Sequence, residues 1–141
     1  MAGQQEEIYF LRLSLPSSIA PRNYYALFNN GCLAIPCTLL HYYAHLKPYP
    51  LSPGEVLFVL QTIEYALVEG ALPSYNELSV RMGVTHKMVR RYAKSLEEKG
   101  YLHREPRAGF TNQFDLTRLF DALLKASSRT NDETEKGDVA K

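Results

Sequence analysis

Hydrophobic residues recur at helical spacing in two stretches of the middle of the chain. One stretch covers residues 53–69 and the other covers residues 85–99. In the second stretch Val89, Tyr92 and Leu96 fall on one side of a helix wound at about 100° per residue. The spacing therefore predicts two amphipathic helices, each with one face directed to a core.

Capping residues separate these two stretches and place a third, short helix between them. Ser74, with Glu77 three residues later, forms a capping-box sequence that predicts a helix over residues 75–82. Gly83 can adopt the positive φ of a tight turn, and Thr85 is a good N-cap for the next helix. Gly100 is suited to end that helix. Residues 74–99 therefore predict a helix-turn-helix.

The residues after Gly100 predict a β-hairpin. Residues 101–104 and 111–114 favour strands, and residues 107–109 would form the tip between them. A helix-turn-helix followed by a small wing over residues 101–116 is a winged helix. The predicted fold class is therefore α+β and mostly helical, with a winged helix-turn-helix and a small β-wing.

The flanking segments complete the predicted organisation. Residues 1–30 form an N-terminal extension with a short strand over residues 8–15, and residues 31–126 form the winged-helix domain. Helices are predicted over residues 36–46, 53–69 and 115–126, and residues 127–141, which lack aromatics, are predicted to be a disordered tail. The core positions predicted for the 53–69 helix are Val56, Leu57, Leu60, Ile63, Leu67 and Val68.

Charge is unevenly distributed although the formal net charge is only +1. Residues 71–107 contain eight Lys and Arg against four Asp and Glu, whereas both flanking segments carry more acids than bases. The side of the 85–99 helix opposite its apolar face gathers basic residues without an acid among them: His86, Lys87, Arg90, Arg91 and Lys94. A cationic helix face of this kind suits a DNA groove lined by phosphates, although solvated charged faces are also common.

The helix-turn-helix and wing contain a specific pattern. It comprises Leu72-Pro73-Ser74, Leu78, Gly83-Val84, Val89-Arg90, Leu96-Glu97, Lys99-Gly100 and Arg104-Glu105-Pro106-Arg107-Ala108-Gly109. This pattern resembles the DNA-binding domain of the GntR family. The resemblance implies that the second helix enters the major groove and that the wing, with Gly109 at its tip, reaches the minor groove. No large effector-binding domain of the kind found in that family follows the wing in this sequence.

Segments on both sides of the module are similar to a different group of proteins. They are Gly31-Cys32-Leu33-Ala34-Ile35-Pro36, Leu39-Leu40, residues 51–57 and residues 111–120. These segments resemble phage and plasmid replication-initiation or replisome-organiser proteins, which also carry a winged helix. The two resemblances agree on a DNA-binding module and differ on the role it serves.

Candidate chemistry other than DNA binding is sparse. Cys32, Cys37, His41 and His45 form a possible zinc-ligand set, but the last three lie on one polar helix face, which makes solvent-exposed residues with a buried Cys32 the simpler reading. The sequence contains no phosphate-binding loop, no HExxH and no GxSxG. We therefore predict no enzyme activity, no cofactor and no metal.

The N-terminus and the apolar runs bear on location. Residues 1–7 are polar and acidic, unlike a signal peptide, and no apolar run approaches the ~20 residues of a membrane span. The sequence thus predicts a cytoplasmic protein that does not engage a membrane.

The predicted function is sequence-specific binding of double-stranded DNA, with transcriptional regulation preferred. A replication initiator or replisome organiser is the first alternative, and a winged helix that binds only protein is the second. Double-stranded DNA is the expected partner, with a homodimer and replication proteins as further candidates. The predicted DNA-binding residues are Ser74, Thr85, His86, Lys87, Arg90, Arg91, Lys94, Arg104, Arg107 and Gly109. Arg90 is the predicted base-reading residue, with Arg91 and Arg107 on phosphates.

Overall fold

The computed structural model describes residues 25–105 and 113–139, with side chains for residues 27–105 and 114–129. The chain divides into two compact units, residues 1–34 and residues 35–141. In the first unit a 3-10 helix, η1, covers Tyr25–Asn30. The predicted strand over residues 8–15 lies outside the described residues. The predicted domain boundaries at residues 30 and 126 stay predictions.

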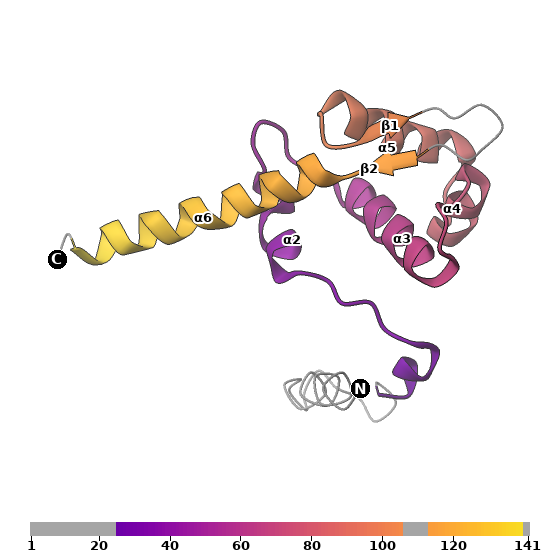
Figure 1. Cartoon of the computed structure of the whole chain (residues 1–141), viewed down its shortest axis with the longest axis horizontal. Helices are drawn as coiled ribbons and strands as arrows, with labels where there is room; N and C mark the ends of the chain where they lie inside the picture. Colours follow the sequence, from indigo (N-terminus) through magenta and orange to yellow (C-terminus); the bar gives the residue numbers. More distant parts are fainter. Residues whose placement is uncertain (1–24, 106–112, 140–141) are drawn as a thin grey trace. The chain divides into compact units, whose positions relative to one another are not determined.

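The second unit contains a helix-turn-helix followed by a two-stranded hairpin (Figure 1). Its elements are α2 Cys37–Tyr42, η2 Tyr43–His45, α3 Pro53–Glu69, α4 Tyr75–Met82, α5 His86–Glu98, β1 His103–Glu105, β2 Gln113–Asp115 and α6 Thr117–Val139. The strands are antiparallel, and Arg104 lies opposite Phe114. This arrangement confirms the predicted α+β winged helix-turn-helix. No helix in the described part of the chain has both the length and the apolarity of a membrane span.

Local capping explains why three of these helices begin where they do. At α3 the Ser52 hydroxyl accepts from the Glu55 backbone N–H at 3.2 Å, and the Glu55 carboxylate accepts from the Ser52 N–H at 3.0 Å. The same reciprocal pair forms between Ser74 and Glu77 at α4. At α5 the Thr85 hydroxyl accepts from the Met88 N–H at 3.2 Å. Each cap pairs a backbone donor that the first turn cannot satisfy.

The turn between α4 and α5 depends on Gly83, whose φ of 66° lies in the left-handed region. The Val84 N–H donates to the Ser79 carbonyl at 3.1 Å, which closes the end of α4. Because residues with a Cβ seldom adopt this φ, glycine is favoured at the position. The tight turn brings α5 back against α4 and fixes which side of α5 is buried.

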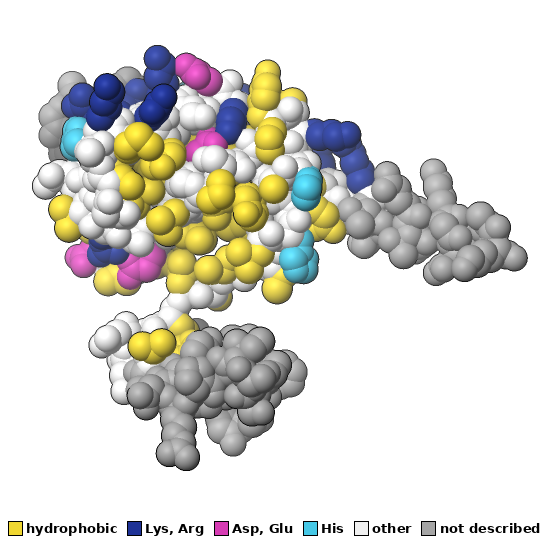
Figure 2. All heavy atoms as spheres, turned by 180° about the vertical axis from the view of Figure 1, so that it is seen from behind, with side chains coloured by type: hydrophobic (Ala, Val, Ile, Leu, Met, Phe, Trp, Pro, Cys, Tyr) yellow, Lys and Arg dark blue, Asp and Glu magenta, His cyan; other side chains and the backbone are white. Residues whose placement is uncertain are grey.

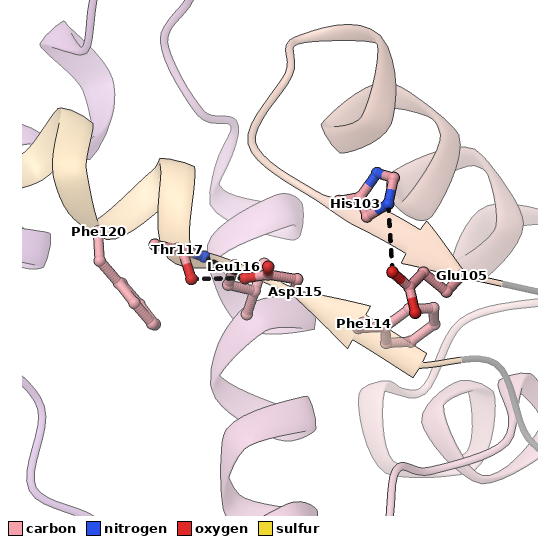
Figure 3. A pocket seen from close by; sticks show the side chains of 7 residues that line it. All are labelled: His103, Glu105, Phe114, Asp115, Leu116, Thr117 and Phe120. Carbon is pink, nitrogen blue, oxygen red and sulfur yellow. Dashed lines mark hydrogen bonds and ion pairs between the residues drawn. The ribbon is translucent and has the colours of Figure 1, made fainter.

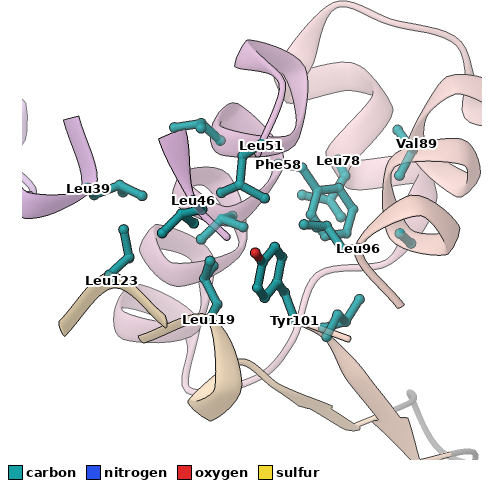
Figure 4. Close-up of a cluster of buried hydrophobic side chains, with 14 residues drawn as sticks. Leu39, Leu46, Leu51, Phe58, Leu78, Val89, Leu96, Tyr101, Leu119 and Leu123 are labelled. Carbon is teal, nitrogen blue, oxygen red and sulfur yellow. The ribbon is translucent and has the colours of Figure 1, made fainter. Parts of the chain in front are cut away.

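A single hydrophobic core joins the helices of the second unit (Figure 4). Val89 and Leu96 of α5 are fully buried, as is Leu78 of α4. Leu119 and Leu123 of α6 join the same cluster of buried residues. The remaining buried hydrophobic members are Leu39, Leu46, Leu51, Val56, Phe58, Val59, Ala93, Tyr101 and Leu102. The core therefore fixes α5 by one face and leaves the other face to solvent.

The predicted core face of α3 was partly wrong. Leu67 and Val68 are 72% and 67% exposed, whereas Phe58 and Val59 are buried. The first half of α3 is apolar on every side, so periodicity alone does not select a face. Packing against α4, α5 and the hairpin selects it, and the Phe58 ring lies 6.4 Å from the ring of Phe114.

Other element boundaries also differ from the prediction. The 36–46 helix is divided into α2 and η2, and the first strand begins two residues later than predicted. The predicted start of the second strand, residues 111–112, lies outside the described residues. Helix α6 does not end at residue 126: the backbone of residues 127–139 is helical in place of the predicted disordered tail. That segment contains no proline to stop a helix that packing has already started, and its polarity alone does not prevent helix formation.

Candidate nucleic-acid interface

The two sides of α5 differ sharply in burial and charge. Val89, Ala93 and Leu96 are buried to within 1% of complete. On the other side the five basic residues predicted from the sequence are all exposed: His86, Lys87, Arg90, Arg91 and Lys94. In Figure 2 the surface over α5, at the upper left, shows the corresponding concentration of Lys and Arg. We refer to these five residues as the α5 row.

The α5 row has few partners among the residues that the structure describes. Its one ion pair joins Lys94 to Glu98 at 3.9 Å, with both side chains more than two-thirds exposed. Such a pair contributes about 0.3–0.5 kcal/mol and is screened by salt. The Arg91 guanidinium lies 3.9 Å from the Met88 sulfur, and the His86 ring contacts the edge of Tyr75. The cations of the row are therefore available to an anionic ligand.

Two of the predicted DNA-binding residues, Ser74 and Thr85, are the N-caps of the two helices of the motif. Ser74 both accepts from the Glu77 N–H and donates to the Glu77 carboxylate, so its hydroxyl proton is already engaged. The Thr85 hydroxyl accepts from Met88, and no partner of its proton lies among the described residues. Thr85 is thus better placed than Ser74 to donate to a phosphate.

Glu77 itself is held in its charged form. Hydrogen bonds from Ser74 and from the Tyr65 hydroxyl, the latter 2.8 Å long, lower the pKa of the Glu77 carboxyl below its usual value. The same contact raises the pKa of Tyr65. This acid belongs to the start of α4, so its charge is committed to the cap and does not neutralise the α5 row.

Arg104 is engaged within the protein. Its Nε lies 3.0 Å from the Glu97 carboxylate, and its Nη1 donates to the Tyr75 hydroxyl at 2.7 Å. The side chain is 34% exposed. Arg104 therefore ties β1 to both helices of the motif, a role that its position in a sequence pattern does not reveal. Arg107 and Gly109, predicted at the wing tip, lie outside the described residues.

A second internal tie holds the far end of α5 and was not predicted. The Lys99 ammonium donates to the Glu55 carboxylate at 2.6 Å and to the Pro50 carbonyl at 2.8 Å. Burial raises the pKa of Glu55. Hydrogen bonds from Lys99 and Ser52 and the charge of Lys99 lower it by a larger amount, so the pKa lies below its usual value. Local sequence patterns do not reveal this pair, because Glu55 and Lys99 are 44 positions apart.

A pocket of about 330 Å³ lies at the base of the hairpin, where β2 leads into α6 (Figure 3). His103 and Glu105 on β1 lie 3.9 Å apart, and both are largely exposed. The Asp115 carboxylate accepts from the Thr117 hydroxyl and N–H, which lowers the pKa of Asp115. Both carboxylates are therefore engaged in contacts within the hairpin and the start of α6.

The candidate zinc ligands do not form a metal site among the described residues. Cys32 and Cys37 are both exposed, so the expectation of a buried Cys32 was wrong. No group of three potential ligands is found in the described ranges. His41 and His45 instead line a pocket together with residues of α6.

The helix-turn-helix, hairpin and exposed α5 row define a winged-helix protein. Comparison with protein-family models and with curated proteins finds no match to this sequence. Among solved structures, the chain is similar to the crystal structure of the N-terminal domain of DnaD protein from Geobacillus kaustophilus HTA426, with a TM-score of 0.64 and 20% sequence identity. The match covers 83% of this chain and 98% of that chain. At this identity the likeness shows a shared fold.

Proposed function

We propose that this protein binds double-stranded DNA through the α5 row and acts in the initiation of DNA replication. The observation that carries the binding proposal is a set of exposed cations on one face of a helix whose other face is buried. A helix held in this way can enter a major groove about 12 Å wide while the core stays intact. Neutralising phosphates with Lys and Arg releases counterions, which supplies much of the affinity.

Within the α5 row, the first two turns carry the proposed sequence reading. Side chains near the start of a recognition helix reach base edges in helix-turn-helix complexes. Arg90 lies near the centre of the exposed face, and an arginine fork fits guanine O6 and N7. Arg91 and, at the wing, Arg107 are the proposed phosphate contacts, with Thr85 as a hydroxyl donor. Arg104 is proposed to position β1 rather than to contact DNA.

This proposal prefers a replication role, whereas the sequence alone favoured transcriptional regulation. DnaD is a replication-initiation protein, and its N-terminal domain shares this fold. The similarity of residues 31–36 and 111–120 to replication-initiation proteins supports the same role. The GntR-like pattern supports the DNA-binding module, but no comparison extends it to a regulator. Self-association and contact with other replication proteins belong to this proposal.

The test of DNA binding uses fluorescence anisotropy with a labelled duplex across a range of salt concentrations. The triple variant Lys87→Ala/Arg90→Ala/Lys94→Ala should lose most of the affinity and reduce the dependence on salt, by about 0.9 in slope for each phosphate contact removed. Arg118→Ala is the matched control, because Arg118 is an exposed cation on α6 away from α5. Binding that is absent or independent of salt would reject the proposal and favour a winged helix that binds protein.

The role is tested by selection of bound fragments from genomic DNA. A replication initiator should enrich clustered, repeated sites within a short region. A transcriptional regulator should instead enrich isolated sites upstream of genes, and that result would restore the GntR-like reading.

A further inference from the structure

A second basic surface lies between α2–η2 and α6, away from the α5 row. It is a pocket of about 380 Å³ lined by eight residues, five of which are His, Lys or Arg. No Asp or Glu lines it. The basic lining residues are His41, His45, Lys47, Lys125 and Arg129. We refer to it as the α2–α6 pocket.

The fold explains how residues far apart in the sequence come together there. Helices α2 and α6 are in contact, and Leu39, Leu46, Leu119 and Leu123 belong to the buried core that joins them. His41 and His45 are four residues apart, as are Lys125 and Arg129, so each helical segment contributes two basic residues one turn apart. The convergence of two basic pairs is a property of the tertiary structure.

Among the described residues, no acid neutralises the Lys and Arg side chains of the α2–α6 pocket. In the described part of the chain, no ion pair involves Lys47, Lys125 or Arg129. Asp121, one turn before Lys125 on α6, does not line the pocket. Like charges gathered in a concave site repel one another, and an anionic ligand relieves that repulsion.

The shape and chemistry of the pocket favour a phosphate chain over a bound base. Five of its eight lining residues are basic, and the other three are Tyr42 and two alanines. Lys, Arg and His are all donors to phosphate oxygens. In Figure 2 two histidines and a group of Lys and Arg lie where α6 leaves the body, on the same face that shows the cations of α5.

We infer that the α2–α6 pocket is a second phosphate-binding site, which holds the backbone of the same DNA outside the segment read by α5. This inference rests on the proposed function. It extends the DNA-binding surface from the helix-turn-helix to the segments that flank it. The expected consequence is a footprint longer than the few base pairs that one recognition helix can cover.

The test compares duplexes of increasing length with the full chain. The variant Lys125→Ala/Arg129→Ala should leave binding to a short duplex unchanged. On duplexes long enough to reach the pocket it should lower the magnitude of the salt slope by about 1.8, since each lost phosphate contact removes about 0.9. Arg118→Ala, on the same helix but outside the pocket, should leave both slopes unchanged. Thermal melting by circular dichroism verifies that each variant is folded.

Histidine resonances identify the ligand directly. The imidazole signals of His41 and His45 should shift when a long duplex is added to the wild-type protein, and not when a short duplex is added. If inorganic phosphate shifts them and long duplexes do not, the pocket holds a free phosphate and the inference is wrong. An unchanged salt slope in the pocket variant, with DNA binding still lost in the α5 triple variant, overturns the inference and leaves the proposed function intact. A wild-type protein that binds no DNA overturns both.

Discussion

Basic residues serve different purposes on the exposed face of α5 and at its C-terminal end. Along its exposed face, the α5 row makes one weak ion pair among the described residues. At its C-terminal end, Lys99 binds Glu55 at 2.6 Å, and Arg104 of β1 binds Glu97 of α5 at 3.0 Å. Both groups consist of Lys and Arg, but only Lys99 and Arg104 have close acidic partners. The α5 row is therefore available to a ligand, whereas Lys99 and Arg104 stabilise the fold.

The difference follows from burial. Glu55 is 3% exposed, and a carboxylate removed from water needs a cation and hydrogen bonds to remain charged. The Lys99 ammonium supplies both and also binds the Pro50 carbonyl. Among the described residues, no buried acid binds a cation of the exposed face. The part of the helix that can bind DNA is therefore determined by where Asp and Glu lie, and not by how many Lys and Arg it carries.

The largest expected effect on stability comes from removing the buried partner. Lys99→Ala should lower the free energy of unfolding by about 3 kcal/mol, because it leaves the Glu55 carboxylate buried without its cation. Lys94→Ala, a matched removal from the exposed face, should change it by less than about 0.5 kcal/mol. Urea denaturation of both variants measures this. Equal losses in the two variants would show that Lys99 does not stabilise the fold more than an exposed lysine of the same helix.

A smaller loss is expected at the β1 junction. Arg104→Ala removes an ion pair that is about one-third exposed and a hydrogen bond to Tyr75, and should cost about 1–2 kcal/mol. Arg104→Lys should recover only part of this, because lysine lacks the fork that reaches both partners. DNA affinity should fall less in Arg104→Ala than in Arg91→Ala. A greater fall would place Arg104 on the DNA.

The ion pair of Glu55 should also make the stability of the fold depend on pH. The pKa of Glu55 is lower in the folded protein than in the unfolded chain, so its contribution to stability is present above the unfolded value of 4.5 and is lost as pH falls through the folded value. Stability should therefore decline below about pH 5. Glu55→Gln should decline less steeply, as followed by urea midpoints from pH 7 to pH 3. An unchanged pH profile in this variant would contradict the role assigned to the ion pair.

The smallest effect on stability is expected at Arg90. Arg90→Ala should change the free energy of unfolding by less than about 0.5 kcal/mol. It should nevertheless relax preference at one base pair, with a loss of about 1–3 kcal/mol of discrimination. Arg91→Ala should weaken all sequences alike. Binding-site selection distinguishes the two, and an intact selected motif for Arg90→Ala would remove it from base reading.

Features encoded by neighbouring residues were predictable from sequence. The bounds of α3 and α4 match the prediction because a capping box starts each helix and a glycine ends it. The α5 row was predictable for a similar reason, since helical periodicity alone places it opposite Val89 and Leu96. Both features depend on residues within one or two turns of each other.

Features that depend on distant residues were not predictable. The Lys99–Glu55 pair joins the end of α5 to the start of α3, and the α2–α6 pocket joins segments at either side of the helix-turn-helix. The buried face of α3 was misassigned because its apolar residues leave several faces equivalent until α4 and α5 pack. In each case tertiary contacts decide what local patterns leave open.

Gly54 shows how such a contact restricts later change. A Cβ at this position would lie 2.5 Å from the Tyr92 ring, so the tyrosine of α5 rests directly on the backbone at the start of α3. Alanine is normally favoured over glycine in a helix by about 0.5–1 kcal/mol, but here it would displace a half-buried ring. Positions 54 and 92 therefore form one steric unit. Proteins that share this packing should covary at the two sites, with a larger residue at one accompanied by a smaller one at the other.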